Sequence, residues 1–324
     1  MYTTLEKSGK EKYNQNRNNP TTESHSEDVL TEVREYWWNE DFLELTARRL
    51  NFKNCHNVAD IGCGTGTMTF ALSRYFSPET TLNGLDADKR HIRKAIQRSR
   101  KESRATGQVF RFIEGNAASI PFQDSEMDLS FCQTLLIHVE DPILVLNEMK
   151  RITSDQGWIL ALEPNNLVTS LMFDTYAQTD YSIPELLKIV EVRLRCENGK
   201  RKLGLGYNSV GDALPDLFHQ VGLKDIQVWI SDKALSCIPP YDTREKRVRV
   251  SQLIEWLESG TGGFNYDQNY RYFKAGGGSK SDFNAYWANW LIHKEELLKD
   301  LKEQRFISAG GSLMYIVAGK VEKP

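Results

Sequence analysis

The stretch that decides the fold is Asn57-Val-Ala-Asp-Ile-Gly-Cys-Gly-Thr-Gly66, which runs directly into Thr67-Met-Thr-Phe-Ala-Leu72. A short apolar strand is followed by a glycine turn and then by the start of a helix. Parallel α/β sheets build a ligand crevice in this way, at the carboxyl end of a strand. Glycine allows positive φ angles and a close approach of the backbone to a bound molecule. We therefore expect a ligand site at this turn.

The glycine spacing narrows the class of ligand. Gly62, Gly64 and Gly66 form G-x-G-x-G, whereas a dinucleotide fingerprint reads G-x-G-x-x-G. Thr67 stands where the third glycine of that fingerprint would fall. Twenty residues after Gly66, the next apolar run ends in Asp86, whose carboxylate can accept both hydroxyls of a ribose. The spacing disfavours a pyrophosphate site and suits a nucleoside cofactor.

Four segments in a fixed order extend this pattern. They are Val58-Ala-Asp-Ile-Gly-Cys-Gly-Thr-Gly66, Gly84-Leu-Asp86, Glu114-Gly-Asn-Ala117, and Asp128-Leu-Ser-Phe-Cys-Gln133 followed by His138. The series resembles the motif series of class I S-adenosylmethionine (SAM)-dependent methyltransferases. It is most similar to the branch that contains the ubiquinone and menaquinone biosynthesis methyltransferases. The resemblance covers roughly residues 36–165 closely and continues more thinly to the C-terminus.

The resemblance implies a set of cofactor-binding residues for SAM. Asp60 and the turn lie near the methionine moiety with Gln133, Asp86 binds the ribose, and Ala87, Asn116 and Ala117 meet the adenine. Many relatives have aspartate at position 116, so the amide of this chain alters the available hydrogen-bond donors. The full expected set is Asp60, Gly62, Cys63, Gly64, Gly66, Asp86, Ala87, Asn116, Ala117 and Gln133.

Catalytic residues are harder to specify, because methyl transfer needs little side-chain chemistry. Positioning alone can supply roughly 7 to 11 kcal/mol, and a base is needed only when the acceptor must lose a proton. His138 follows the fourth expected strand and Glu163 ends the fifth, so both are candidates for a general base. For His138 a structural or cofactor-contacting role is the alternative. Cys63 is better explained as a small side chain within the turn than as a nucleophile.

Composition sets the broad class. The chain has 324 residues, of which 40% are hydrophobic and 26% are charged, and these are ordinary values for a globular protein. A net charge of −3 provides no general field for nucleic acid. The five cysteines are scattered, without a C-x-x-C pair, which predicts free thiols and no metal site. The N-terminus is polar and no apolar run reaches membrane-spanning length, so we expect a cytoplasmic protein without a membrane association.

Hydrophobic periodicity predicts the order of elements. Strands and helices alternate with short connections, which indicates a parallel, doubly wound α/β sheet. The resemblance implies a Rossmann-like sheet of seven strands, the last one antiparallel, with helical cap insertions. Strands are expected near 57–61, 81–86, 108–114, 127–132, 158–163, 225–230 and 312–318; helices are expected near 67–76, 88–104, 141–152, 167–176, 184–195 and 212–221.

Two insertions interrupt the alternation, and the last strand arrives about eighty residues late. We expect a flexible segment 1–26, a core 27–235 that contains a cap insertion 167–207, a helical insertion 236–308, and the final strand within 309–324. The second insertion shows helices near 244–258 and 281–304, joined by a loop rich in glycine and aromatic residues. Our hypothesis is that both insertions form the acceptor pocket. The alternative is a helical pair on the flank of the sheet or at a homodimer interface.

These features predict a SAM-dependent methyltransferase that acts on an oxygen, nitrogen or carbon atom of a small molecule. A protein or RNA methyltransferase is one alternative, since the helix 88–104 is strongly basic, although a solvated outer face explains that helix better. A non-catalytic SAM-binding regulatory protein is another alternative. An NAD-dependent oxidoreductase is disfavoured by the glycine spacing. Ile238-Pro-Pro-Tyr241 imitates a signature of amino-group methyltransferases, but it lies in the wrong part of the chain and lacks the leading polar residue.

Overall fold

A single seven-stranded sheet forms the centre of the computed structural model, which describes residues 32–170 and 181–323. Along the sheet the strands follow the order β3-β2-β1-β4-β5-β7-β6. All neighbours are parallel except β7, which runs antiparallel to both β5 and β6. The strands are β1 (Asn57–Ile61), β2 (Thr81–Asp86), β3 (Val109–Glu114), β4 (Met127–Gln133), β5 (Thr153–Pro164), β6 (Lys224–Ile230) and β7 (Met314–Lys320). The predicted α/β class and the antiparallel last strand are confirmed.

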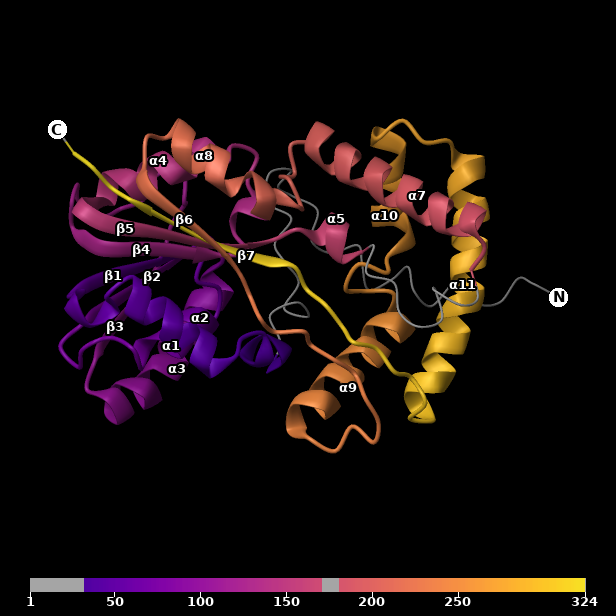
Figure 1. The fold of residues 1–324 in the computed structure, drawn as a ribbon, viewed down its shortest axis with the longest axis horizontal. Helices are drawn as coiled ribbons and strands as arrows, with labels where there is room; N and C mark the ends of the chain where they lie inside the picture. Colours follow the sequence, from indigo (N-terminus) through magenta and orange to yellow (C-terminus); the bar gives the residue numbers. More distant parts are fainter. Residues whose placement is uncertain (1–31, 171–180, 324) are drawn as a thin grey trace.

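Helices cover both faces of this sheet, as Figure 1 shows. One face carries α1 (Glu40–Arg49), α2 (Thr67–Ser73) and α3 (Lys89–Thr106), and the other carries α4 (Pro142–Ile152) and α8 (Leu214–Gln220). Short 3-10 turns complete the core: η2 (Glu32–Tyr36), η3 (Phe52–Asn54), η4 (Leu136–His138) and η5 (Val210–Ala213). Asp141 caps α4 by accepting a hydrogen bond from Leu144 N at 3.2 Å, and Pro142 takes the first helical position.

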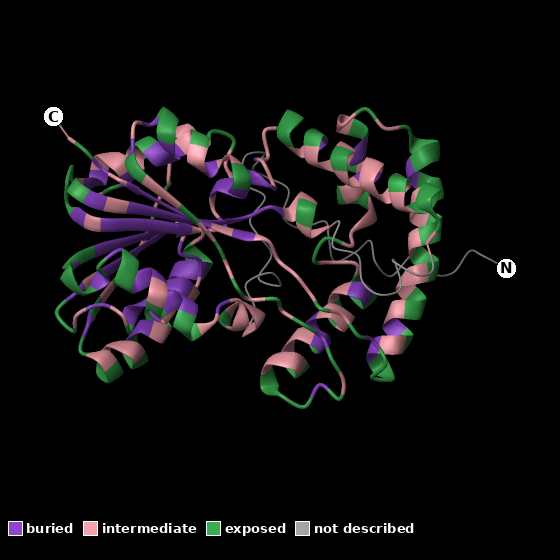
Figure 2. Cartoon of the chain, in the orientation of Figure 1, coloured by how far each residue is buried: buried purple, intermediate pink, exposed green. Residues whose placement is uncertain are grey.

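The alternation of side chains along β1 divides the core into two layers. Val58 packs with α1 and α2, whereas Ala59 and Ile61 pack with α4 and α8. Period-two alternation is the rule for a strand with helices on both faces. Figure 2 shows that buried residues gather along the central strands. The central strands therefore form the core of the molecule, with one packed layer on each face of the sheet.

The two insertions come together as one helical unit beside the sheet (Figure 1). It consists of α7 (Ile183–Lys202), α9 (Arg244–Ser259), α10 (Tyr266–Ala275) and α11 (Lys280–Lys302), while the short α5 (Asn166–Thr169) leads into it. Glycines allow α7 and α10 to touch through their backbones. A Cβ atom on Gly199 would lie 1.8 Å from the carbonyl oxygen of Tyr272, and one on Gly276 would lie 2.0 Å from that of Arg195.

Several sequence-based boundaries are wrong in this unit. The stretch expected to be a glycine and aromatic loop contains the helix α10, and its aromatic side chains pack with Phe283 in a small core. The helix expected near 184–195 extends to Lys202 as α7, and Lys200, Arg201 and Lys202 lie in its last turn, where cations suit the helix C-terminus. The helix expected at 167–176 is described only as α5, because the rest of that range, like residues 1–26, lies outside the described residues.

The strand order creates one point where neighbouring connections leave in opposite directions. The central strand β1 pairs with β2 on one side and with β4 on the other. In open α/β sheets the ligand crevice lies outside the carboxyl ends of the strands at such a switch point. Asp60 on β1 and Gln133 on β4 therefore belong to the same edge.

Candidate functional site

The glycine turn after β1 is held in a shape that only glycine adopts without strain. The φ angles of Gly62, Gly64 and Gly66 are 74°, 54° and 81°. The peptide nitrogens of Gly62 and Cys63 both donate to the carbonyl oxygen of Leu85, at 2.7 and 2.9 Å. This anchoring ties the turn to β2 and brings the ends of both strands together.

Asp60 is the last but one residue of β1, just before this turn, and is almost fully buried, at 2% exposure. Its Oδ2 atom accepts a hydrogen bond of 2.5 Å from the hydroxyl of Thr69 on α2. Burial raises the pKa of Asp60 to about 7, and the nearby Asp86 carboxylate adds to the rise. A carboxylate in this position can accept further hydrogen bonds from a bound ligand that carries a positive charge or a donor group.

Asp86 ends β2 and points back toward the turn. One carboxylate oxygen accepts from Gly64 N at 2.8 Å, and the other accepts from Asp88 N at 2.8 Å. The ring of His91, which is 5% exposed, places Nδ1 at 3.3 Å from Asp86 Oδ1. The sequence did not identify His91 as a partner of Asp86, because it lies among the many basic residues of α3. These contacts fix the direction of the carboxylate.

The predicted cofactor residues divide into two groups in space. A narrow pocket at the switch point is lined by Arg34, Asp60, Gly62, Cys63, Thr65, Thr67, Met68 and Gln133. Ala87, Asn116 and Ala117 lie outside this pocket, at the ends of β2 and β3. Asn116 uses its side-chain oxygen locally, since it accepts from Ala118 N at 2.9 Å. The structure therefore brings the glycine turn and the ends of β1 and β4 together at the pocket. The end of β2 contacts the turn through the hydrogen bond from Gly64 N to Asp86.

Cys63 lines the pocket as a small apolar side chain. It is 8% exposed, and burial raises the pKa of its thiol well above the ordinary value. A thiol with a raised pKa is a poor nucleophile, because the thiolate is the reactive form. This agrees with the expectation that Cys63 serves the shape of the turn.

Four lining residues were not predicted: Thr65, Thr67 and Met68, which lie beside the glycine turn, and Arg34, which comes from a different segment of the chain. Arg34 lies on η2, and its Nη2 atom donates to the hydroxyl of Thr134 at 3.0 Å, just beyond β4. Its guanidinium stacks on the Trp37 ring at 4.7 Å. Burial lowers the pKa of Arg34 to about 10, while the Glu163 carboxylate opposes that shift. No local sequence pattern identifies Arg34 as a site residue, because η2 reaches the pocket through the tertiary fold and lies far from Asp60 and Gln133 in the sequence.

Glu163, a predicted base, is fully buried near the end of β5. Its Oε1 atom accepts from the peptide nitrogens of Leu135 and Leu136, both at 2.8 Å, whereas its Oε2 atom is buried without a hydrogen-bond partner among the described residues. Burial raises the pKa of Glu163 to about 7. One oxygen is thus held by the backbone, while the other is buried without a partner among the described residues and Glu163 does not line the switch-point pocket.

His138, the second candidate base, lies at the end of η4 and is partly exposed. The first insertion packs against this turn. Lys200 Nζ of α7 donates to the carbonyl oxygen of Ile137 at 3.2 Å, and a Cβ atom on Gly206 would lie 3.0 Å from the carbonyl carbon of His138. His138 is therefore placed between the sheet edge and the helical unit.

The turn η2 is tied to the second insertion and to α3. Glu32 pairs with Arg244 of α9 at 2.7 Å, and Glu35 pairs with Arg98 of α3 at 3.0 Å. Trp38, which follows η2, is 7% exposed and packs with Phe42 in the core. Both insertions thus contact segments that border the pocket.

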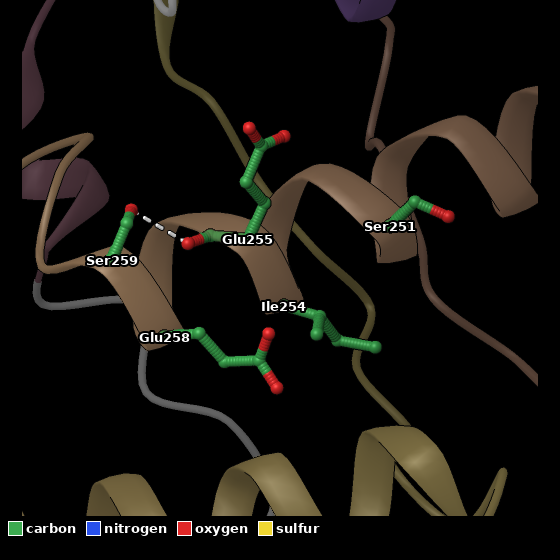
Figure 3. Close-up of a pocket in the computed structure, with 5 residues that line it drawn as sticks. All are labelled: Ser251, Ile254, Glu255, Glu258 and Ser259. Carbon is green, nitrogen blue, oxygen red and sulfur yellow. Dashed lines mark hydrogen bonds between the residues drawn. The ribbon is translucent and has the colours of Figure 1, made fainter.

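A second pocket lies on the surface of α9 and is drawn in Figure 3. All five lining residues come from that one helix: Ser251, Ile254, Glu255, Glu258 and Ser259. Ser259 Oγ donates to the Glu255 carbonyl oxygen at 2.7 Å, which leaves that hydroxyl engaged in its own helix. The pocket offers no group from a second element, so it does not compete with the switch-point pocket as a functional site.

Within residues 32–170 and 181–323, no group of three or more His, Cys, Asp or Glu side chains is arranged to hold a metal ion. In the same part of the chain, no helix is long and apolar enough to cross a membrane. All five cysteines are free thiols, as predicted.

The chain is similar to known methyltransferases over part of its length. Residues 52–202 match the family model described as a methyltransferase domain. The chain is 32% identical over 135 residues to the demethylmenaquinone methyltransferase of Geobacillus kaustophilus; the aligned part is 42% of this chain and 55% of the relative. It is 28% identical over 207 residues to the demethylmenaquinone methyltransferase of Anoxybacillus flavithermus; the aligned part is 62% of this chain and 81% of the relative. Among solved structures, the YcgJ protein from Bacillus subtilis shares 19% identity and a TM-score of 0.46, over 88% of this chain and 100% of that one. The chain spans about half the length of most of the curated relatives it matches.

Proposed function

We propose that this chain is a class I SAM-dependent methyltransferase and that it transfers a methyl group from SAM to an oxygen, nitrogen or carbon atom of a small molecule. The match of residues 52–202 to a methyltransferase domain supports the proposal. The observation that carries the proposal is the pocket at the switch point, where Asp60, the glycine turn and Gln133 converge under η2. SAM supplies an activated methyl group on a sulfonium. The protein supplies the binding, the orientation and the exclusion of water.

The residues of the turn fit a nucleoside cofactor. A Cβ atom on Gly62 would lie 2.8 Å from Leu135 Cδ1, and a Cβ on Gly84 would lie 2.3 Å from Phe112, so both positions require glycine where the backbone closes on the site. The Asp86 carboxylate is fixed by Gly64 N at the edge of the turn, where a ribose can reach its free lone pairs. In this proposal Asp86 binds the ribose, and Ala87, Asn116 and Ala117 border the adenine.

The arrangement of the insertions favours a small acceptor. Lys200 ties α7 to the turn that carries His138, and Arg244 ties α9 to η2. An acceptor held between the sheet edge and the helical unit would contact both, an arrangement that suits a small molecule. The curated relatives named demethylmenaquinone methyltransferase also favour a small organic acceptor.

Glu163 is the better candidate for a base. Its free Oε2 atom and a pKa raised to about 7 suit a group that accepts a proton near neutral pH. We assign the transfer of the acceptor proton, where the acceptor has one to lose, to this oxygen. His138 then contributes to the shape of the acceptor site. A cytoplasmic location is part of the proposal and is supported by the five free thiols, which suit a reducing compartment.

Binding of S-adenosylhomocysteine tests the cofactor assignment. Calorimetric titration of the wild type should show binding of S-adenosylhomocysteine and none of NAD, and Asp86→Ala should abolish the former. Asp88→Asn is the matched control, because that side chain caps α3 through Arg90 N at 2.8 Å. Preferential binding of NAD would overturn the assignment.

The acceptor class needs a separate experiment. The protein is incubated with methyl-labelled SAM and a cell extract, which is then divided into small molecules, protein and RNA. Label among the small molecules supports the proposal. Label in protein or RNA would instead support a macromolecular substrate, for which the basic helix α3 offers a surface. Binding of S-adenosylhomocysteine without any transferred label would indicate a non-catalytic, SAM-binding regulatory protein.

A further inference from the structure

Two opposite charges on one face of α7 are not paired with each other. Arg193 and Glu197 lie four residues apart, so their side chains leave the helix on the same side. In the described part of the chain no ion pair joins them, and the Arg193 Nε and Glu197 Oε1 atoms are both buried without a hydrogen-bond partner. On another face of the same helix, Glu191 pairs with Lys188 at 2.9 Å and with Arg195 at 2.8 Å. The helix therefore pairs its more exposed charges and leaves two buried polar atoms without partners.

The face that carries these two side chains is turned toward the edge of the sheet. Lys200, three residues after Glu197, donates to the carbonyl oxygen of Ile137 in η4 at 3.2 Å. Ser209, which precedes η5, lies beside the Glu197 carboxylate: burial raises the pKa of Glu197, and the hydroxyl and peptide nitrogen of Ser209 oppose that rise. The unpaired atoms therefore lie on the side of the helical unit where an acceptor would approach the sheet.

Arg193 is also bordered by a second helix of the unit. Burial raises the pKa of Tyr286 on α11, and the positive charge of Arg193 opposes that rise. A guanidinium nitrogen that has left water needs a hydrogen-bond partner to offset the lost hydration. An oxyanion suits this group best, because Nε and a terminal nitrogen can donate two parallel hydrogen bonds to a carboxylate or a phosphate.

Glu197 offers the complementary acceptor. Its Oε1 atom can accept a hydrogen bond from a hydroxyl or an ammonium group. The order of the two residues, with the cation first, is the less favourable order for an ion pair along a helix, so a ligand does not have to break a strong internal pair. We propose that Arg193 binds an oxyanion of the methyl acceptor and Glu197 binds a hydroxyl or ammonium group of the same molecule. This inference rests on the proposed function and names its substrate class: polar acceptors that carry both groups.

The positions along α7 give such an acceptor a direction. Measured along the helix axis from Lys200, which contacts η4, Glu197 lies about 4.5 Å away and Arg193 about 10 Å away. The oxyanion is thus held farther from the sheet edge, and the hydroxyl or ammonium group is held nearer to η4 and His138. Arg193 then contributes the binding and orientation of the acceptor and takes no part in the chemistry.

The structure of the natural product tests the substrate class. The wild type is incubated with methyl-labelled SAM and a cell extract, the labelled small molecules are purified, and mass spectrometry identifies their functional groups. We expect a carboxylate or a phosphate in the product, and the spectrum distinguishes these two sources of the oxyanion. A labelled product without an oxyanion would overturn the inference while the proposed function stands. The absence of any labelled small molecule would overturn both.

Variants of the two residues test their role with the acceptor so identified. Arg193→Gln should raise the KM of the acceptor roughly 10- to 100-fold, the usual effect of losing a charge-assisted hydrogen bond, and leave kcat and the Kd of S-adenosylhomocysteine unchanged. Arg193→Lys, which retains the positive charge, should recover part of the loss. Glu197→Gln, which keeps the shape of the side chain, should also raise the KM.

The matched control is Lys188→Gln, which removes a cation from another face of α7 and should leave the KM unchanged. Thermal melting checks that each variant keeps its fold, and Arg193→Lys carries the test if Arg193→Gln does not fold. A KM that is the same for the wild type and the Arg193 variants would show that this residue does not bind the acceptor. Equal increases in KM for Arg193→Gln and Lys188→Gln would point to a general effect on the helix and would also overturn the inference.

Discussion

The hydroxyl of Thr69 on α2 donates a 2.5 Å hydrogen bond to the buried carboxylate of Asp60 at the end of β1. This bond links the helix that follows the glycine turn to the strand that precedes it. It is also the one side-chain donor within the protein that holds Asp60 Oδ2 in place among the described residues. The strand, the turn and the helix therefore act as one rigid element at the switch point.

Thr69→Val should destabilise the protein. Valine keeps the shape of threonine but leaves a buried carboxylate oxygen without its donor, at a cost of about 1–3 kcal/mol in unfolding free energy. Urea unfolding measures the change. The control is Thr67→Val, whose hydroxyl faces only Thr65 at 3.4 Å, and its effect should be smaller than about 0.5 kcal/mol. Equal effects of the two variants would contradict this account of Asp60.

The buried Glu163 should make stability depend on pH. Burial raises its pKa from 4.5 to about 7, so the folded protein keeps a proton that the unfolded chain has released, and stability falls as the pH rises through this window. Glu163→Gln removes this titration. Between about pH 5 and about pH 8, the variant should gain up to about 3 kcal/mol in unfolding free energy relative to the wild type. Parallel curves for the two proteins would show that Glu163 does not titrate in this way. Glu79→Gln, at an exposed carboxylate, is the control.

Glu163→Gln should also reduce turnover if the acceptor must lose a proton. Glutamine can still accept from Leu135 N and Leu136 N, so the local backbone should keep its position. Loss of a general base lowers kcat roughly 100- to 10,000-fold, with the Kd of S-adenosylhomocysteine unchanged. A steady-state assay with the identified acceptor measures kcat. A normal kcat would show that the acceptor needs no base at this position.

His138→Ala should lower turnover more than it lowers cofactor affinity. The side chain lies on η4, where Lys200 of the helical unit meets the sheet edge, so its removal alters the space for the acceptor. Kinetics and calorimetry on one preparation give both quantities. His219→Ala, at an exposed position on α8, is the matched control. Unchanged kcat with the true acceptor would remove His138 from the acceptor site.

Gly199→Ala should disrupt the helical unit. The added Cβ would lie 1.8 Å from the Tyr272 carbonyl oxygen, so α7 and α10 must separate, at a typical cost of 1–3 kcal/mol. Hydrogen exchange should increase in α10 and leave the strands protected. Asn198→Ala, on the exposed face of the same turn, should leave exchange unchanged. Increased exchange in β1 would show instead that the unit and the sheet unfold together.

The parts of this fold that were predictable are those with local causes. The turn at Gly62 could be predicted from the local sequence, because a glycine-rich segment between an apolar strand and a helix can adopt few other structures. The helix α10 was missed because glycines flank it on both sides, at 260–263 and 276–278. Its stability comes from packing against α7 at Gly199, which no window of local sequence contains. Arg34 was missed for the same reason, since its place depends on ion pairs at Glu32 and Glu35 with distant helices.

The position of β7 has a consequence for how the protein is made. This strand lies between β5 and β6 and pairs with both, yet it follows the whole second insertion in the chain. During synthesis β6 has no neighbour in the sheet until the ribosome has added residues 314–320. The helices α9, α10 and α11 emerge first, and α10 can pack against α7, which precedes all three in the chain, while the gap in the sheet is still open. Closure of the sheet is thus a late event in biosynthesis, and the unpaired edge of β5 is the surface that a chaperone would need to protect until then.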